Sequence, residues 1–292
     1  MRLIWRRCGP AARLPGVRSV RPVLLGVFAA VLLAAAGGVA WLALGRTEAE
    51  AASEALPVPP DVPRLASGPE YERCLSLVRQ DPDEARSFAE GWEAGGGGEG
   101  ARHCSALALI ALGEPERGAE RLEGLARVSR ASAATRASIF AQAGQAWMMA
   151  NDGGRAFGAT TMALTLAPDD PELLTDRAIA LGTLGRYAEA LDDLNRVVRL
   201  DPDRAEAWVF RAAAHRHLDR VDQAAEDVAR ALTLAPDSAE ALLERGIIRQ
   251  LRGDTAGARA DWERAITLAP DSATADLAQQ NLALNEAGPQ RR

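Results

Sequence analysis

Apolar, small and proline positions recur with a fixed period in the second half of this chain. The phrases LTLAP, VRLDP, LTLAP and ITLAP end at Pro168, Pro202, Pro236 and Pro270, which are 34 residues apart. A period of this length indicates stacked supersecondary units rather than a globule built around one active site. We therefore divide the region into units one to four, which are residues 137–170, 171–204, 205–238 and 239–272.

Each unit is predicted to hold two closely packed helices. Position 8 is always small (Gly144, Ala178, Ala212, Gly246) and position 20 is always alanine (Ala156, Ala190, Ala224, Ala258). The proline at position 32 ends the second helix, because it cannot continue the hydrogen-bond ladder. Asp169, Asp203 and Asp237 are predicted to cap the next helix, since a glutamate follows each three residues later, as in a capping box.

The regions on either side of the four units carry a weaker pattern. The pattern of residues 70–136 indicates degenerate helical repeats. The expected helices are 70–79, 83–94, 101–112 and 116–127, and the glycines 95–98 are expected to form a flexible connection. Residues 273–285 predict a capping helix that shields the last unit, with Leu277 and Leu284 on its packed side. Residues 286–292 are expected to be a disordered tail. The fold class is therefore an all-α solenoid.

The N-terminus carries a long apolar segment. Residues 23–44 are uncharged and, as a helix, would span roughly 33 Å, enough for a transmembrane helix or signal anchor. Six arginines lie in the basic segment 1–22, so the positive-inside rule keeps that end in the cytoplasm. A cleaved signal peptide is the alternative, with a possible cleavage site at Ala49-Glu50-Ala51. Residues 45–69 read as a Pro/Ala-rich linker.

Composition and charge exclude several classes of function. All 34 basic residues are arginine, and the absence of lysine excludes a Walker A loop or a Schiff-base lysine. Residues 137–285 hold 15 arginines against 23 acidic residues, a balance that argues against nucleic acid as a partner. No catalytic motif is found, so we expect no enzyme activity, no metal and no cofactor.

Arginine and aspartate vary together between the units. Arg177, Arg211 and Arg245 occupy position 7, and Asp193, Asp227 and Asp261 occupy position 23. In unit one both positions are alanine, Ala143 and Ala159. This covariation favours structural ion pairs, within a unit or between neighbours, and a carboxylate-binding clamp is the alternative.

The cysteines suggest a disulfide, whereas the histidines suggest no metal site. Cys74 and Cys104 would both lie outside the cytoplasm, where neighbouring thiols tend to form a disulfide; two buried free thiols are the alternative. His215 and His217 are two residues apart on a helix, so they face different directions and cannot chelate one ion. With His103, they are interpreted as ordinary surface or groove residues.

The aligned units resemble the tetratricopeptide repeat family. Unit two matches best, with Ala178, Gly185, Tyr187, Ala190 and Pro202 at the signature positions. The other units depart from the pattern, since Asp219 replaces the turn glycine and Val221 and Thr255 replace the tyrosine. The resemblance implies a right-handed α-solenoid whose first helices line a concave peptide- or protein-binding groove.

By this resemblance, groove residues occupy positions 2, 5, 9, 12 and 13 of each unit. They include Glu172, Thr175, Ile179, Glu206, Val209, Ala213, Arg216, His217, Glu240, Leu243, Ile247 and Gln250. The set combines an acidic rim with apolar patches, so a basic and apolar segment would complement it.

Together these features predict a membrane-anchored interaction protein of unknown partner, a scaffold or chaperone-like adaptor in a bacterial cell envelope. Its folded part would lie in the periplasm, either tethered to the inner membrane or soluble after signal cleavage. An accessory subunit of an envelope biogenesis enzyme complex is the alternative.

Overall fold

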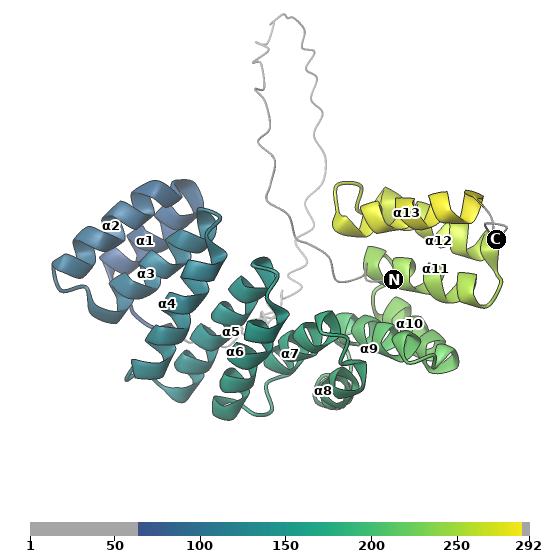
Figure 1. Ribbon diagram of the computed structural model, residues 1–292, viewed down its shortest axis with the longest axis horizontal. Coiled ribbons are helices and arrows are strands. Elements are labelled where there is room, and N and C mark those ends of the chain that lie inside the picture. Colours follow the sequence, from purple (N-terminus) through teal and green to yellow (C-terminus); the bar gives the residue numbers. More distant parts are fainter. Residues whose placement is uncertain (1–63, 288–292) are drawn as a thin grey trace, which may run out of the picture. The chain divides into compact units, whose positions relative to one another are not determined.

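The computed structural model describes residues 64–287, which form one unit of thirteen α-helices and no β-strand. The helices are α1 (Pro69–Gln80), α2 (Pro82–Ala94), α3 (Gly98–Ala111), α4 (Pro115–Val128), α5 (Ala133–Met149), α6 (Gly153–Leu166), α7 (Pro171–Thr183), α8 (Tyr187–Leu200), α9 (Ala205–His217), α10 (Val221–Leu234), α11 (Ala239–Leu251), α12 (Thr255–Leu268) and α13 (Ala273–Ala287). Each helix packs against the next in sequence, as Figure 1 shows. The predicted all-α solenoid is confirmed for these residues.

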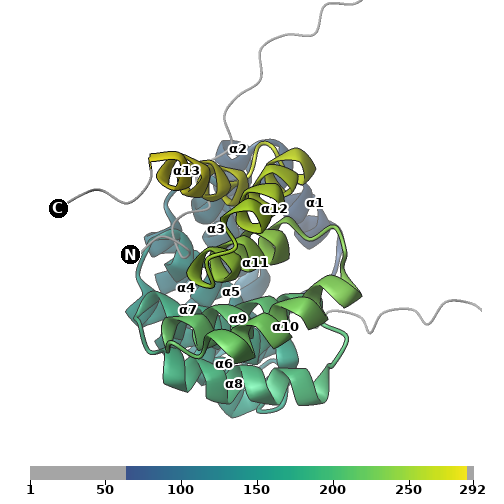
Figure 2. The ribbon, with the colours of Figure 1, turned by 90° about the vertical axis from the view of Figure 1, so that its right-hand side faces the viewer.

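The helix boundaries follow the 34-residue period. The second helices α6, α8, α10 and α12 begin at Gly153, Tyr187, Val221 and Thr255, and the first helices α7, α9, α11 and α13 begin at Pro171, Ala205, Ala239 and Ala273. Each first helix from α5 to α11 also contacts the following first helix. Figure 2 looks along this stack, with α11 and α12 nearer than α3. Among the helices of the four units, α5 departs from the period, since it begins four residues before the expected boundary at 137.

Small side chains allow the two helices of a unit to approach. The four alanines at position 20 are all buried. At position 8, a Cβ atom on Gly246 would lie 2.3 Å from Trp262 Nε1, and one on Gly144 would lie 2.8 Å from Thr160 Cγ2. Glycine therefore stands where the facing side chain leaves no room for a methyl group.

The turn between the two helices needs one residue with left-handed backbone. Glycine occupies this position at Gly113, Gly185 and Gly253, with φ between 73° and 83°. Asn151 (φ 61°) and Asp219 (φ 59°) occupy it in units one and three. Asparagine and aspartate tolerate this conformation better than other non-glycine residues, so unit three keeps the same turn without a glycine.

The predicted capping boxes are wrong. The first helices are preceded by Asp170, Arg204 and Ser238, and Asp170 and Ser238 accept backbone N–H groups of their helices. Asp169, Asp203 and Asp237 lie one residue too early to cap. They pair instead with arginines of the next second helix, Arg196, Arg230 and Arg264.

The arginines at position 7 and the aspartates at position 23 form ion pairs inside each unit. Arg177, Arg211 and Arg245 donate from Nε (2.7, 2.8 and 2.9 Å) and from Nη2 (2.6 Å each) to Asp193, Asp227 and Asp261. The aspartates are buried. In unit one the equivalent alanines, Ala143 and Ala159, are buried in the same place. The pairs thus join the first helix of a unit to its own second helix.

Two further links hold the N-terminal helices. Cys74 of α1 and Cys104 of α3 form a disulfide with a Cα–Cα distance of 5.9 Å. Beside it, buried His103 contacts the Tyr71 hydroxyl through Nδ1 and the Gln142 amide oxygen through Nε2, each at 2.7 Å. Burial lowers the pKa of His103, so the ring stays neutral at neutral pH. These contacts connect α1, α3 and α5.

The C-terminal helix packs differently from the prediction. Ala275 and Ala278 are fully buried, and Leu277 and Leu282 pack beside them. Leu284, which was expected on the packed side, is 71% exposed. The helix also continues to Ala287, beyond the expected start of a tail at residue 286. It occupies the place of a first helix in a fifth unit and covers α11 and α12.

The predicted N-terminal segments fall largely outside the described residues. This holds for the basic segment 1–22, for the apolar segment 23–44 and for most of the linker 45–69. At the linker's end Leu65 packs against the core and Arg64 pairs with Glu72, so residues 64–69 belong to the folded part. Within residues 64–287, no helix combines the length and apolar character needed to span a membrane.

Candidate functional site

Successive first helices form one continuous face of the repeat region. The contacts α5–α7, α7–α9, α9–α11 and α11–α13 place these helices side by side. We call the surface made by positions 2, 5, 9, 12 and 13 of α7, α9 and α11 the first-helix face. It contains the twelve residues predicted from the sequence.

These twelve residues differ in exposure. Glu172, Glu206, Glu240 and Gln250 are exposed, and Ile179, His217 and Ile247 are half-buried. The other five, Thr175, Val209, Ala213, Arg216 and Leu243, are buried. The buried five pack between neighbouring helices, so the sequence overestimated the accessible set. Seven of the twelve side chains are therefore accessible on this face.

The accessible polar part of this face is acidic. Glu172, Glu206 and Glu240 share position 2, and none forms an ion pair within the described part of the chain. Each arginine of α7, α9 and α11 is already paired, with Asp193, Asp227, Glu244 or Asp261. The three glutamates therefore keep their negative charge uncompensated by these helices.

Asp176 adds to this acidic region and was missed by the sequence analysis. Gln145 of α5 donates a hydrogen bond of 3.3 Å to Asp176 Oδ2. The pKa of the Asp176 carboxyl is raised to about 6, chiefly by burial and also by the charges of Glu172 and Glu206, while the hydrogen bond from Gln145 opposes the rise. The influence of glutamates from α7 and α9 shows that carboxylates of successive units act on one another.

A buried polar cluster joins units two, three and four beside the same face. Arg216 of α9 donates to Glu244 of α11 at 2.6 Å, and both side chains are buried. Burial raises the pKa of Glu244, and Arg216 opposes the rise. The His217 ring stacks on Tyr187 with centroids 4.2 Å apart. Burial, followed by the Arg216 charge, lowers the pKa of His217 to about 4, so this ring is neutral at pH 7.

Arg216 therefore serves as a link between repeats rather than as an exposed contact. The sequence carried a signal for it, because complementary charges stand at position 12 of unit three and position 6 of unit four. His217 lies on the accessible face as an aromatic surface. Within residues 64–287, no group of three or more His, Cys, Asp or Glu side chains is arranged to hold a metal ion.

Comparison with known proteins identifies the repeats. Residues 143–215 and 211–283 match the family model described as the tetratricopeptide repeat. A thermophilic TPR protein of Thermus thermophilus is 18% identical, with a TM-score of 0.52, over 65% of this chain and 99% of that one. A chain of the APC/C hetero-tetramer Cut9–Hcn1 is 15% identical, with a TM-score of 0.56, over 73% of this chain and 42% of that one.

A third match is closer in sequence and shorter. The first TPR of Spaghetti, bound to an HSP90 peptide, is 29% identical with a TM-score of 0.39, over 40% of this chain and 93% of that one. No curated protein sequence matches the chain. Residues 143–283 thus match the tetratricopeptide repeat model, and the two longer structures share the all-helical fold of the chain.

Proposed function

We propose that the tetratricopeptide repeats of residues 143–283 bind a protein partner through the first-helix face, and that the bound segment is basic and apolar. The fold belongs to a family of non-catalytic interaction scaffolds. The observation that carries the proposal is the row of Glu172, Glu206 and Glu240, which repeats every 34 residues without arginine partners.

The surroundings of these glutamates support a mixed contact. Half-buried Ile179 and Ile247 lie on the same helices and offer apolar surface between the charges. Carboxylates at the rim attract a basic segment and fix its register, while the apolar residues supply the area removed from water. The face is preformed by helix packing, so little ordering of this protein opposes binding.

Site-specific photo-crosslinking tests which face binds. A benzoylphenylalanine at Gln250, on the first-helix face, is expected to yield adducts with the partner in cells that express the full chain. The matched control is the same group at Ala229, which is exposed on α10. Equal yields at both positions, or crosslinked segments that are acidic, would contradict the proposal.

We also propose that the chain is anchored in a bacterial inner membrane with its repeats in the periplasm. Support comes from the uncharged segment 23–44 behind six arginines. The Cys74–Cys104 disulfide also supports it, because disulfides persist in oxidising compartments. An intact mass that includes residue 1, with resistance to alkaline extraction, is expected; a mass that begins at residue 52 would show signal cleavage instead.

In this place the protein would act as a scaffold or chaperone-like adaptor in the cell envelope. The stoichiometry of the crosslinked partners tests this role. Several substoichiometric partners are expected. One partner in a fixed ratio would instead identify an accessory subunit of an envelope biogenesis complex.

A further inference from the structure

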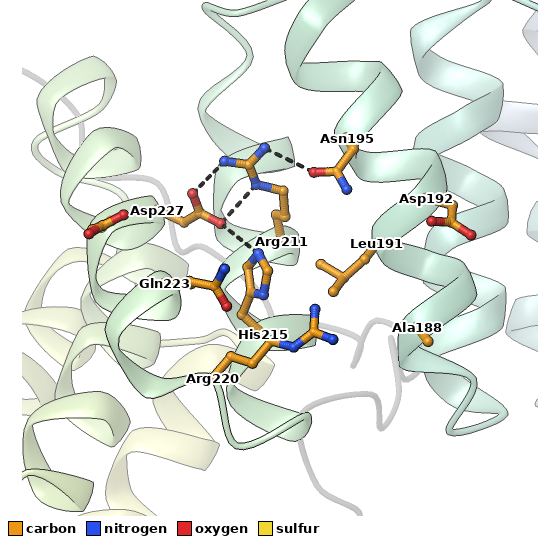
Figure 3. A pocket seen from close by; sticks show the side chains of 10 residues that line it. Ala188, Leu191, Asp192, Asn195, Arg211, His215, Arg220, Gln223 and Asp227 are labelled. Carbon is orange, nitrogen blue, oxygen red and sulfur yellow. Dashed lines mark hydrogen bonds and ion pairs between the residues drawn. The ribbon is translucent and has the colours of Figure 1, made fainter.

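A cleft of about 510 Å³ lies between α8, α9 and α10, outside the first-helix face. We call it the α8–α10 cleft; its lining includes Leu191, Asn195, Arg211, His215, Arg220 and Asp227. Figure 3 shows Arg211 and His215 directed towards Asp227 on one wall, with Leu191 on the opposite wall. Two of its three walls come from second helices.

In unit four, a longer side chain occupies the position equivalent to His215. That residue is Arg249, whose Nη1 donates to Asp261 Oδ2 at 2.7 Å and to the Gly257 carbonyl at 3.2 Å. Asp261 thereby accepts guanidinium groups from both Arg245 and Arg249. The imidazole of His215 is too short to make the corresponding contact with Asp227.

The opposite wall of the cleft also carries smaller side chains than the equivalent positions one repeat earlier. In unit two, the Arg186 guanidinium lies 4.4 Å from the Phe157 ring centroid and pairs with Glu189 at 2.6 Å. The equivalent residues around the cleft are Arg220, Leu191 and Gln223. Arg220 consequently has neither an aromatic surface beneath it nor a carboxylate partner within the described residues. The cleft is open because Leu191 replaces the larger Phe157 of the preceding unit and His215 replaces the longer Arg249 of unit four.

The cleft contains unused hydrogen-bonding capacity. Asp227 Oδ2 accepts Arg211 Nε at 2.8 Å, but His215 Nε2 lies 3.8 Å away, beyond hydrogen-bond distance. The His215 residue is only 9% exposed, and its buried Nδ1 has no hydrogen-bond partner among residues 64–287. Buried polar atoms without partners are uncommon in native proteins, and they indicate a missing ligand or water.

The charges at the rim favour a cation. Asp192 and Glu226 line the cleft and form no ion pair in the described part of the chain. Arg211 and Asp227 neutralise each other, so two carboxylates remain against the single charge of Arg220. The apolar side chain of Leu191 offers a surface for methylene groups.

We propose that the α8–α10 cleft binds an arginine side chain of a partner protein. Its guanidinium takes the place that Arg249 fills in unit four and donates to Asp227 Oδ2. Its methylene groups lie against Leu191, and Asp192 and Glu226 attract its charge. Arg220 turns away to admit it. This contact is separate from the first-helix face and would give the protein a second point of attachment.

Calorimetric titration of the full chain in detergent with N-acetylarginine amide tests the proposal. Saturable binding is expected for the wild type. His215→Arg copies unit four and fills the cleft, so binding should weaken at least tenfold while the fold is retained. Leu191→Phe copies Phe157 and should have the same effect, which guards against a folding defect in one variant. Arg220→Ala removes the competing charge and should strengthen binding severalfold.

A variant of the first-helix face separates the two sites. Glu172→Gln/Glu206→Gln/Glu240→Gln should bind N-acetylarginine amide as the wild type does. The proposal is overturned if no saturable binding occurs, if both filling variants bind normally, or if the triple variant abolishes binding. It is also overturned if N-acetylglutamate amide binds instead and Arg220→Ala removes that binding, because the cleft would then be an anion site.

Discussion

Ion pairs such as Arg177–Asp193 recur at equivalent positions in three units and are replaced by alanine in unit one. The Asp193 carboxylate is buried, so the pair must compensate for the loss of its hydration. In unit one, two buried alanines of the same apolar core, Ala143 and Ala159, occupy the equivalent positions. The contribution of the ion pair to stability can therefore be measured by replacing both residues with alanine, as in unit one.

A double-mutant cycle in unit two is the corresponding prediction. Arg177→Ala leaves Asp193 buried and unpaired, and is expected to lower the free energy of unfolding by about 3 kcal/mol. Arg177→Ala/Asp193→Ala restores the arrangement of unit one and should lose less than the single arginine variant. Urea unfolding measures the stability of both variants and of Asp193→Ala, the second single variant of the cycle. A double loss equal to the sum of the two single losses would show that the residues do not act as a pair.

Asp176 gives a pH-dependent prediction. Its pKa is about 6 in the folded protein and 3.8 in the reference state, so protonation favours folding, and this contribution is lost as pH rises from 3.8 through 6. Asp176→Asn keeps an acceptor for Gln145 and removes the charge. It should stabilise the fold by about 2 kcal/mol at pH 7 and have little effect near pH 4.

The control for Asp176 is its neighbour Glu172 on the same helix. Glu172→Gln should change the unfolding free energy by no more than about 0.5 kcal/mol at either pH. Urea unfolding at the two pH values distinguishes the variants. Equal effects of Asp176→Asn at pH 4 and pH 7 would show that its carboxyl has an ordinary pKa.

Single residues were the least predictable level. The periodic Arg and Asp positions indicated ion pairs because they varied together, although the sequence left open whether each pair joins one unit or two. Arg216 and Leu243 were placed on an open groove because a resemblance assigns positions and not burial. Asp176 and His215 do not repeat, so no internal comparison drew attention to them.

At the level of elements, the turn between paired helices depends on left-handed backbone. Gly185 has φ 73° and no atom within 4 Å of a Cβ position, so conformation alone would oppose a side chain there. Gly185→Ala should cost about 1 kcal/mol or more. Gly158, in the middle of α6 with the same open space, is the control, and Gly158→Ala should stabilise by about 0.5–1 kcal/mol. Thermal unfolding of both variants checks the contrast, and losses of similar size would contradict it.

Helix boundaries were largely predictable because proline and the turn residue repeat every 34 residues. Most expected helices differ from the observed ones by one to three residues. The errors came from local contacts that periodicity does not contain. The predicted caps lie one position before the capping residue and form ion pairs with arginines of the next unit; they are Asp169, Asp203 and Asp237. Helix α13 buries alanines, and the larger Leu284 faces away.

At the level of the whole molecule, the main helix–helix contacts within residues 64–287 join helices that are one or two apart in the order of the chain. Damage at one end should therefore remain local. Cys74→Ala/Cys104→Ala should lower local stability by about 2–4 kcal/mol and reduce the hydrogen-exchange protection of α1. Protection of α11 should be unchanged. Equal loss of protection at both ends would show that the thirteen helices unfold as one cooperative unit.

Binding of a charged peptide to the first-helix face tests the central claim most directly. The probe is a labelled twelve-residue peptide of alternating arginine and leucine, measured by anisotropy with the full chain. Glu172→Gln/Glu206→Gln/Glu240→Gln should weaken binding about tenfold, equivalent to about 1.4 kcal/mol. The matched control, Asp169→Asn/Asp203→Asn/Asp237→Asn, removes the same charge at the same period from exposed residues between units and should leave affinity nearly unchanged. Equal weakening by both triple variants, or equal affinity for a peptide with glutamate in place of arginine, would contradict the account.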